Sequence, residues 1–376
     1  MASRVKLLIT ISELIYSSQF RNLHDLVSLI DRSVFDIEVG ALATGDAAQK
    51  DIEQLDIPVY RLRLQPTRGW SARSMVDLMK GPFLIASKRH DLVHSLLYQS
   101  FFTEPFFFKK LTSAKYIFTK SNLEWANHPL NWRLKCKYAD RIISISSATD
   151  MLLDEQGFGS KKSKIFLGID TQRFRADGEM RASLRAQCGI QGDALVFGCA
   201  AQFVEWKEHF TALKAFELIA ATYPDAHLVY CGANHRDDYY AKFLEALEAS
   251  PWKSRVHLLG NLSDMPAYYS MIDVFVLPSR YETFGYVYVE AMSCGRPVIG
   301  CRAAGPLEII DDGVTGRLIN ISDPRDLATK MESYAGDVDM RIKHGEAARR
   351  RVIELFSKET MAQKTQELYL QTLGRS

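Results

Sequence analysis

The sequence predicts an α/β protein with two parallel-sheet domains that face each other across a cleft. Short apolar and β-branched segments alternate with longer segments of helical periodicity, and this alternation occurs twice along the chain. A polar stretch without periodicity at residues 170–179 separates the two series. The 376 residues also exceed what one hydrophobic core usually supports. Ligands of open α/β domains bind beyond the carboxyl ends of the strands, so we expect the binding site in the cleft.

The first domain is predicted to span residues 1–172. Residues 5–11 form its first strand, because Glu13 interrupts an apolar stretch that would otherwise resemble a signal peptide. A helix follows over 21–30, with Leu23, Leu26 and Ile30 on one face. Further strands are predicted at 35–41, 59–62, 92–95, 116–118, 142–146 and 165–167.

The second domain is predicted to span residues 173–356. Its strands are predicted at 195–200, 227–231, 256–259, 274–277, 298–299 and 316–319. Helices are expected over 208–221 and 239–247, and residues 324–373 are mostly of helical pattern. We expect residues 357–376 to form a C-terminal helix that could return to the first domain.

Composition excludes several classes of protein. The net charge of +2 argues against a dedicated nucleic-acid binder, and no apolar run approaches the roughly 20 residues of a membrane span. The six cysteines are scattered without zinc-site spacing, which favours reduced thiols and a cytoplasmic location. The first half is mildly basic around 109–110 and 133–137. This charge could support peripheral contact at the inner face of a membrane, or simply form a solvated surface.

The clearest chemical signal lies at residues 278–299. The strand over 274–277 ends in a loop that holds Glu282; Gly285 then opens a helix that contains Glu290. Free backbone N–H groups and the positive end of the helix dipole make this junction a seat for a diphosphate. The two carboxylates can accept hydrogen bonds from sugar or ribose hydroxyls. The spacing alone would better suit two surface carboxylates, and the surrounding residues favour the binding site.

This segment resembles the Glu-x7-Glu signature of glycosyltransferase family 4 (group 1), a retaining family with two Rossmann-like domains known as the GT-B fold. The family's next turn is matched by Gly295-Arg296-Pro297-Val298-Ile299, and its phosphate-approaching loop by residues 304–310. The resemblance covers nearly the whole chain and is most specific over 256–316. It implies that Glu282 contacts the donor sugar as a catalytic residue and that Glu290 holds the ribose. The donor-binding groups at the helix start would be Thr283, Phe284, Gly285 and Tyr286.

Lys207 is the second chemical feature, because it follows the strand over 195–200 at the start of a helix. A lysine there can bind the donor diphosphate and stabilise charge on the leaving group, although a surface lysine is the ordinary alternative. The family carries an arginine where this chain has Gln202, and Arg302 is a candidate replacement. The strand-end turn at 258–262 resembles the family's base-contacting turn, which implies a backbone contact at Leu262.

In the first domain, Ser17 and Ser18 stand where the family has glycines that approach a phosphate, and serine hydroxyls could donate instead. His94 resembles a strand-end histidine that faces the cleft in relatives, which would make it catalytic. A packed histidine is an equally good interpretation. Residues 119–122 lack a histidine that many relatives carry. Aromatic loops at 66–74, 98–108 and 122–132 are expected to contact the acceptor.

The resemblance implies a retaining transferase that moves a sugar from a nucleotide diphosphate sugar, with UDP favoured and GDP open, to a glycan, lipid-linked or small-molecule acceptor. We expect no cofactor and no metal, because no Asp-x-Asp stands at a strand end and a cationic pocket can replace one. Two alternatives are a sugar-nucleotide epimerase of the same fold and a non-catalytic partner subunit that binds sugar nucleotides.

Overall fold

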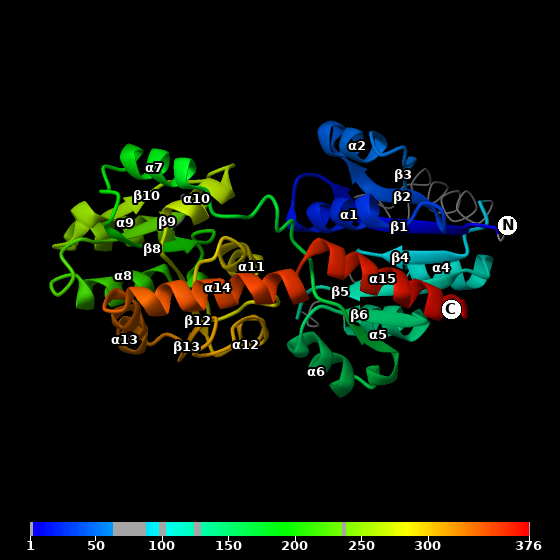
Figure 1. The fold of residues 1–376 in the computed structure, drawn as a ribbon. Coiled ribbons are helices and arrows are strands. Elements are labelled where there is room, and N and C mark those ends of the chain that lie inside the picture. The colour runs from blue at the N-terminus through cyan, green and yellow to red at the C-terminus, as the bar shows by residue number, and fades with distance from the viewer. Residues whose placement is uncertain (1–2, 63–87, 98–102, 124–128, 235–237, 376) are drawn as a thin grey trace. The chain divides into compact units, whose positions relative to one another are not determined.

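The computed structural model describes residues 3–62, 88–97, 103–123, 129–234 and 238–375. Contacts divide the chain into two compact units (Figure 1). Unit 1 comprises Met1–Gly168 together with Lys358–Ser376, and unit 2 comprises Ile169–Ser357. Each unit is a parallel sheet with helices packed on it, so the predicted fold class is confirmed: two Rossmann-like α/β domains.

Unit 1 contains a seven-stranded parallel sheet of order β3-β2-β1-β4-β5-β6-β7 within its described residues. The strands are β1 (Val5–Leu14), β2 (Phe35–Thr44), β3 (Val59–Arg61), β4 (Leu92–Ser95), β5 (Lys115–Lys120), β6 (Arg141–Ser144) and β7 (Lys162–Lys164). The helices described are α1 (Ser18–Leu29), α2 (Asp46–Glu53), α4 (Thr103–Leu111), α5 (Pro129–Tyr138), α6 (Ser147–Glu155) and α15 (Lys358–Leu373).

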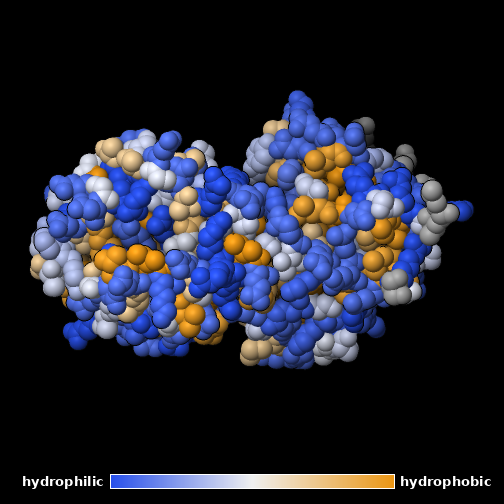
Figure 2. All heavy atoms as spheres, in the orientation of Figure 1, coloured by the Kyte–Doolittle hydropathy of each residue, from blue (hydrophilic) through white to orange (hydrophobic). Residues whose placement is uncertain are grey.

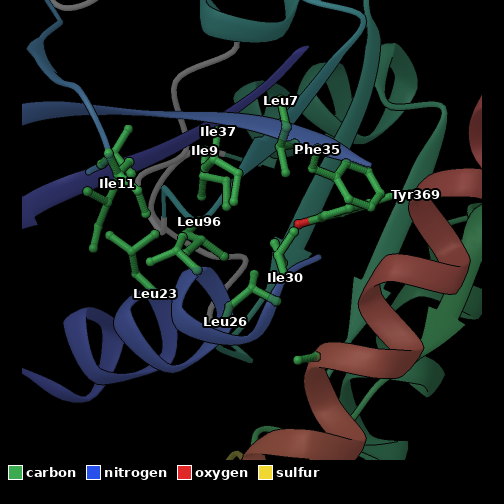
Figure 3. Packing of buried hydrophobic residues seen from close by; sticks show 14 of the residues in the cluster. Leu7, Ile9, Ile11, Leu23, Leu26, Ile30, Phe35, Ile37, Leu96 and Tyr369 are labelled. Carbon is green, nitrogen blue, oxygen red and sulfur yellow. The ribbon is translucent and has the colours of Figure 1, made fainter. Parts of the chain in front are cut away.

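A large hydrophobic cluster of unit 1 lies between its central strands and the helices α1 and α15 (Figure 3). Leu23 and Leu26 of α1 share a buried cluster with the inward residues of β1. Tyr369 of the C-terminal helix joins the same cluster and packs edge-on against Phe35, with ring centroids 5.8 Å apart. Helix α15 is therefore part of the hydrophobic core of unit 1.

Unit 2 contains a six-stranded parallel sheet of order β10-β9-β8-β11-β12-β13 in its described part. The strands are β8 (Leu195–Ala200), β9 (Ala226–Cys231), β10 (Val256–Leu258), β11 (Val274–Leu277), β12 (Val298–Cys301) and β13 (Gly316–Ile319). The helices are α7 (Gly178–Gln187), α8 (His209–Ile219), α9 (Asp238–Ala249), α10 (Met265–Met271), α11 (Tyr286–Ser293), α12 (Pro306–Ile309), α13 (Pro324–Ala335) and α14 (Val338–Leu355).

The order of strands in unit 2 reverses between β8 and β11. From β8 the chain adds β9 and β10 on one side, and from β11 it adds β12 and β13 on the other. The two strands are paired in parallel, with Val274 opposite Phe197. Their carboxyl ends form a topological switch point, where open α/β sheets bind ligands.

One predicted strand is wrong. The segment 165–167 was expected to be a strand from its apolar residues, but the strand β7 lies three residues earlier and carries Lys162 and Lys164. As the last strand of the sheet, β7 pairs only with β6 among the described residues, so its lysines can remain solvated. Ile165 then packs into the core as a loop residue. Helix α7 also begins inside the predicted linker, where Asp177 accepts a hydrogen bond from the N–H of Met180 at 2.9 Å.

The molecular surface is mixed in character. Figure 2 shows apolar residues on the visible face as separate patches between hydrophilic ones. No helix in the described segments is both long and apolar enough to cross a membrane.

Candidate active site

The candidate site lies at the switch point of unit 2, on the loops that follow β8 and β11. The loop after β8 ends in a short 3-10 turn at Glu205–Lys207, and the loop after β11 carries Glu282. The backbone N–H of Arg280 donates to the carbonyl oxygen of Trp206 at 2.9 Å, and the hydroxyl of Ser279 donates to the same oxygen at 3.1 Å. The two loops are therefore fastened to each other.

Lys207 and Glu282 form an ion pair across these loops. The ammonium group of Lys207 donates to Oε1 of Glu282. The side chains are 18% and 13% exposed, so both charges are largely withdrawn from water but open to a ligand at one side. The structure therefore brings together the cation and the first carboxylate that the sequence singled out.

Gly285 sets the start of α11 beside this pair. Its φ of +108° lies in the region that favours glycine, and a Cβ there would approach a ring carbon of Tyr288 to 2.8 Å. No side chain caps the helix at this position. The first backbone N–H groups of α11, at the half-buried Tyr286 and Val287, therefore keep the anion-binding character of a helix N-terminus.

Gly305, in the loop after β12, packs directly on the Glu282 loop. Its backbone N–H donates to the carbonyl oxygen of Glu282 at 2.9 Å. A Cβ at Gly305 would lie only 2.0 Å from the carbonyl oxygen of Phe284, whose side chain is itself buried. This close contact restricts the conformation of residues 282–285.

Glu290 lies one turn inside α11 and is 4% exposed. Its Oε2 accepts a hydrogen bond from the hydroxyl of Tyr269 at 2.8 Å. Burial and the neighbouring Glu290 carboxylate raise the pKa of Tyr269, which keeps the phenol as the donor. Glu290 follows Tyr286 by four residues, so the two side chains lie on the same face of α11. The Tyr269 that donates this hydrogen bond belongs to α10.

The remaining residues predicted in this unit lie at neighbouring strand ends. Gln202 follows β8 with an exposed side chain. Leu262 follows β10, and its backbone hydrogen bond to the Cys231 thiol opposes the rise of that thiol's pKa caused by burial. Arg302, which we considered as the substitute for the missing arginine, pairs with Asp312.

Sequence reasoning missed a second set of charges beside the ion pair. Arg280 bonds Glu205 at 3.0 Å and Glu208 at 2.9 Å. Glu208 has a φ of +58°, and its Oε1 also accepts from the hydroxyl of Ser322 at 2.9 Å. The sequence did contain a signal: the Gly-Arg-x-x-x-x-Lys-Gly pattern of the resembling family ends in glycine where this chain has Glu208. A left-handed backbone favours glycine at such a position.

The residues predicted in the first domain lie in unit 1. Ser17 is the N-cap of α1, where its hydroxyl oxygen accepts from the N–H of Phe20 at 3.1 Å. Ser18 is the first residue of that helix, and both serines are exposed. The Ser17 hydroxyl therefore has a structural use that the sequence did not suggest.

His94 is 2% exposed and has protein partners for both ring nitrogens. Nδ1 lies 2.6 Å from the Tyr369 hydroxyl, and Nε2 lies 2.7 Å from Oγ1 of Thr119. Burial lowers the pKa of His94 to about 3, so the ring is neutral. This geometry favours the packed-histidine interpretation over a catalytic one, because neither nitrogen is open to a substrate. The predicted acceptor loop at 66–74, and parts of those at 98–108 and 122–132, lie outside the described residues.

A known protein family matches the part of the chain that contains this site. The family model described as "Glycosyl transferases group 1" matches residues 180–351. A GDP-mannose-dependent alpha-(1-6)-phosphatidylinositol monomannoside mannosyltransferase of Mycolicibacterium smegmatis is 28% identical over 214 residues, 54% of each chain. The lipopolysaccharide core biosynthesis glycosyltransferase LpsE of Rhizobium meliloti is 29% identical over 201 residues, which are 54% of this chain and 56% of LpsE. The chain thus spans about half the length of these curated relatives.

Solved structures match the fold over nearly its full length. HepE of Anabaena, solved with UDP and glucose, has a TM-score of 0.83 at 21% identity over 97% of this chain and 99% of HepE. A glycosyltransferase from Rickettsia africae has a TM-score of 0.84 at 19% identity over 100% of both chains. At these identities the likeness establishes the fold. Residues 180–351 thus match the model of the glycosyl transferases group 1 family, and the two Rossmann-like units have the GT-B fold.

Proposed function

We propose that this protein is a retaining glycosyltransferase that moves a sugar from a nucleotide diphosphate sugar to a glycan, lipid-linked or small-molecule acceptor. The observation that carries the proposal is the Lys207–Glu282 ion pair at the switch point of unit 2, beside the N-terminus of α11. A cation, a carboxylate and the backbone amides of a helix N-terminus are the groups that a diphosphate and its sugar require.

The ion pair gives each residue a distinct role. When a donor binds, its diphosphate replaces Glu282 as the partner of Lys207, and the ammonium stabilises the charge that grows on the leaving group. The released Glu282 carboxylate then accepts hydrogen bonds from the hydroxyls of the transferred sugar. Glu290 holds the ribose in this proposal, because a carboxylate can accept several hydrogen bonds beside the one from Tyr269.

The names of the similar proteins support this reaction class. The curated relatives are named as glycosyltransferases, and HepE was solved with UDP and with UDP-glucose. The mycobacterial relative is named for GDP-mannose, so GDP is the second donor nucleotide to test. We favour UDP because the HepE likeness extends over almost the whole chain.

A substitution at Lys207 tests the site. Lys207→Met should lower turnover by roughly 10² or more, because the cation acts on charge that develops in the transition state. The matched control is Lys214→Met, which removes the same charge from an exposed position on α8. Release of nucleotide diphosphate from a donor panel, with and without acceptors, is the measurement. Equal turnover in both variants would remove Lys207 from the mechanism.

The same assay separates the alternatives and the finer claims. An isomerised sugar without an acceptor would identify an epimerase, and donor binding without turnover would identify a non-catalytic partner. We expect turnover to persist in a chelator, because Lys207 and the helix amides replace a metal. We also expect the anomeric configuration of the donor to be retained in the product, which NMR of the product reads directly.

We also propose that unit 1 makes peripheral contact with an anionic membrane. The support is the exposed Lys110 in the last turn of α4 and the exposed Lys137 near the end of α5, whereas the neighbouring Lys109 is paired with Asp140. Flotation with anionic vesicles should show association at low salt that is lost at high salt. No salt-sensitive association would overturn this part of the proposal.

A further inference from the structure

A cavity of about 420 Å³ lies at the amino-terminal edge of the sheet in unit 2, at the other end of the strands from Lys207 and Glu282. Leu195 at the start of β8, Asp273 just before β11 and Pro297 just before β12 line its floor. Residues of α7 and α14 form its sides. The volume falls in the range of small-molecule sites.

The cavity is rich in charged side chains. Four arginines line it, together with three carboxylates: Arg181, Arg296, Arg341 and Arg349, with Asp193, Asp273 and Glu346. Asp273 is already neutralised, because its two oxygens lie 2.7 Å from Arg181 and 2.9 Å from Arg185. Glu346 is exposed and lies 3.8 Å from Arg350 on the same helix.

Positive charge therefore remains in excess. Among the described residues, Arg296, Arg341 and Arg349 have no carboxylate within 4.0 Å, and Asp193 is the one lining carboxylate outside the pairs above. Burial lowers the pKa of Arg296 more than the negative charge of Asp273 raises it, which reflects the cost of withdrawing this cation from water. An anion in the cavity would offset this cost.

Neutral carbonyl groups hold these guanidinium groups in place. Arg296 donates to the carbonyls of Tyr269 and Ser270 at the end of α10, at 2.9 and 3.0 Å. Arg341 uses Nη1 for carbonyls at the end of α13, and Arg349 uses Nη1 for carbonyls of two other segments. In the described part of the chain, Nε and Nη2 of Arg341 and Arg349 make no hydrogen bond with an oxygen or nitrogen atom. The donors are thus positioned but unused, which lowers the entropy cost of binding.

The rim of the cavity is apolar. Val338 and Ile342, in the first turns of the 18-residue helix α14, are each 56% exposed. They offer a surface for the carbon skeleton of a ligand whose charged end reaches the arginines.

We propose that this cavity is a second ligand site, separate from the donor site, that binds a small phosphorylated molecule. Guanidinium groups match phosphate oxygens with two parallel hydrogen bonds, and several guanidiniums suit a dianionic phosphate better than a single carboxylate. The phosphate group could come from a phosphate ester or from free inorganic phosphate, and the two are distinguished by titration.

Isothermal titration of the full chain with glucose 6-phosphate, inorganic phosphate and glucose tests the proposal. We expect both phosphate probes or the ester alone to bind, and glucose to fail. Equal affinity for the two phosphates identifies inorganic phosphate as the ligand, and tighter binding of the ester identifies an organic phosphate. Lys207→Met should leave this binding unchanged, which separates it from the donor site.

Arg341→Met should weaken binding of the phosphate probe about tenfold or more, because it removes charge-assisted hydrogen bonds. The matched control is Lys343→Met, which removes a cation from the same helix at an exposed position outside the cavity. Ile342→Glu is the second variant. It adds a negative charge at an exposed rim position that the fold tolerates, and it should also weaken binding. The proposal is overturned if neither phosphate binds, if both cavity variants bind as the parent does, or if Lys343→Met weakens binding equally.

Discussion

At the scale of single residues, the ion pair of Lys207 and Glu282 is the centre of the account. Both residues were predictable from the sequence, since each follows a strongly patterned strand at a predicted ligand-binding edge. Their direct contact was not predictable, because it depends on β8 and β11 being neighbours although 75 residues separate the pair. The same limit explains why Arg280 and Glu208 were missed.

His94 shows the opposite case, in which a strand-end histidine serves stability. Its pKa of about 3 in the folded state lies below the ordinary value of 6.5, so the unfolded state binds more protons between these two pH values. Stability should therefore fall as pH drops through this window, by up to about 1.4 kcal/mol per pH unit from this group.

His94→Gln removes the titrating group and should make the free energy of unfolding of unit 1 less sensitive to acid. Urea unfolding at several pH values between 6.5 and 4 measures the slope for parent and variant. If parent and variant show the same slope, His94 does not contribute to the loss of stability at acid pH.

At the scale of elements, strands were predicted better than loops. The strands at 92–95, 195–200, 274–277 and 316–319 agree with the structure at both ends. The clearest of them is 274–277, a continuous apolar run between Asp273 and Pro278, as buried parallel strands often are. The edge strand β7 escaped prediction because its alternating lysines lack that pattern. The packing of one strand-end loop on another is set by tertiary contacts that local patterns do not contain.

Gly305→Ala tests whether the loop after β12 supports the site. The new methyl group would meet the Phe284 carbonyl at 2.0 Å, so residues 282–285 must move. We expect a loss of about 1–3 kcal/mol in stability and a loss of donor binding. The control is Gly178→Ala at the start of α7, where nothing lies within 4 Å and the helix should gain slightly. Unchanged donor binding in Gly305→Ala would contradict the proposed support.

At the scale of the whole molecule, the chain forms two units of similar architecture. Unit 2 contains the candidate donor site and the arginine-lined cavity, at opposite edges of one sheet. Unit 1 is completed by the helix α15, which brings Met361, Leu368 and Tyr369 into its core. The last helix in the sequence therefore belongs to the first unit of the fold.

Ending the chain at Ser357 tests this division. Each large side chain of α15 that leaves the core costs roughly 1.5–3 kcal/mol, so unit 1 should lose several kcal/mol of stability. Unit 2 should unfold at its original temperature, because α15 is not part of it. Calorimetry with hydrogen exchange assigns the transitions to the units. A parallel loss in both units, or in neither, would contradict the assignment.

The most direct test of the central claim is the affinity for UDP of the parent protein, Lys207→Met and Glu282→Gln, measured by calorimetry. In this account Lys207 binds the diphosphate, and Glu282 pairs with Lys207 only when no donor is bound. Lys207→Met should then weaken UDP binding about tenfold or more. Glu282→Gln should bind UDP as tightly as the parent or more tightly, while losing turnover. Parental affinity in Lys207→Met, or loss of UDP binding in Glu282→Gln, would contradict the account.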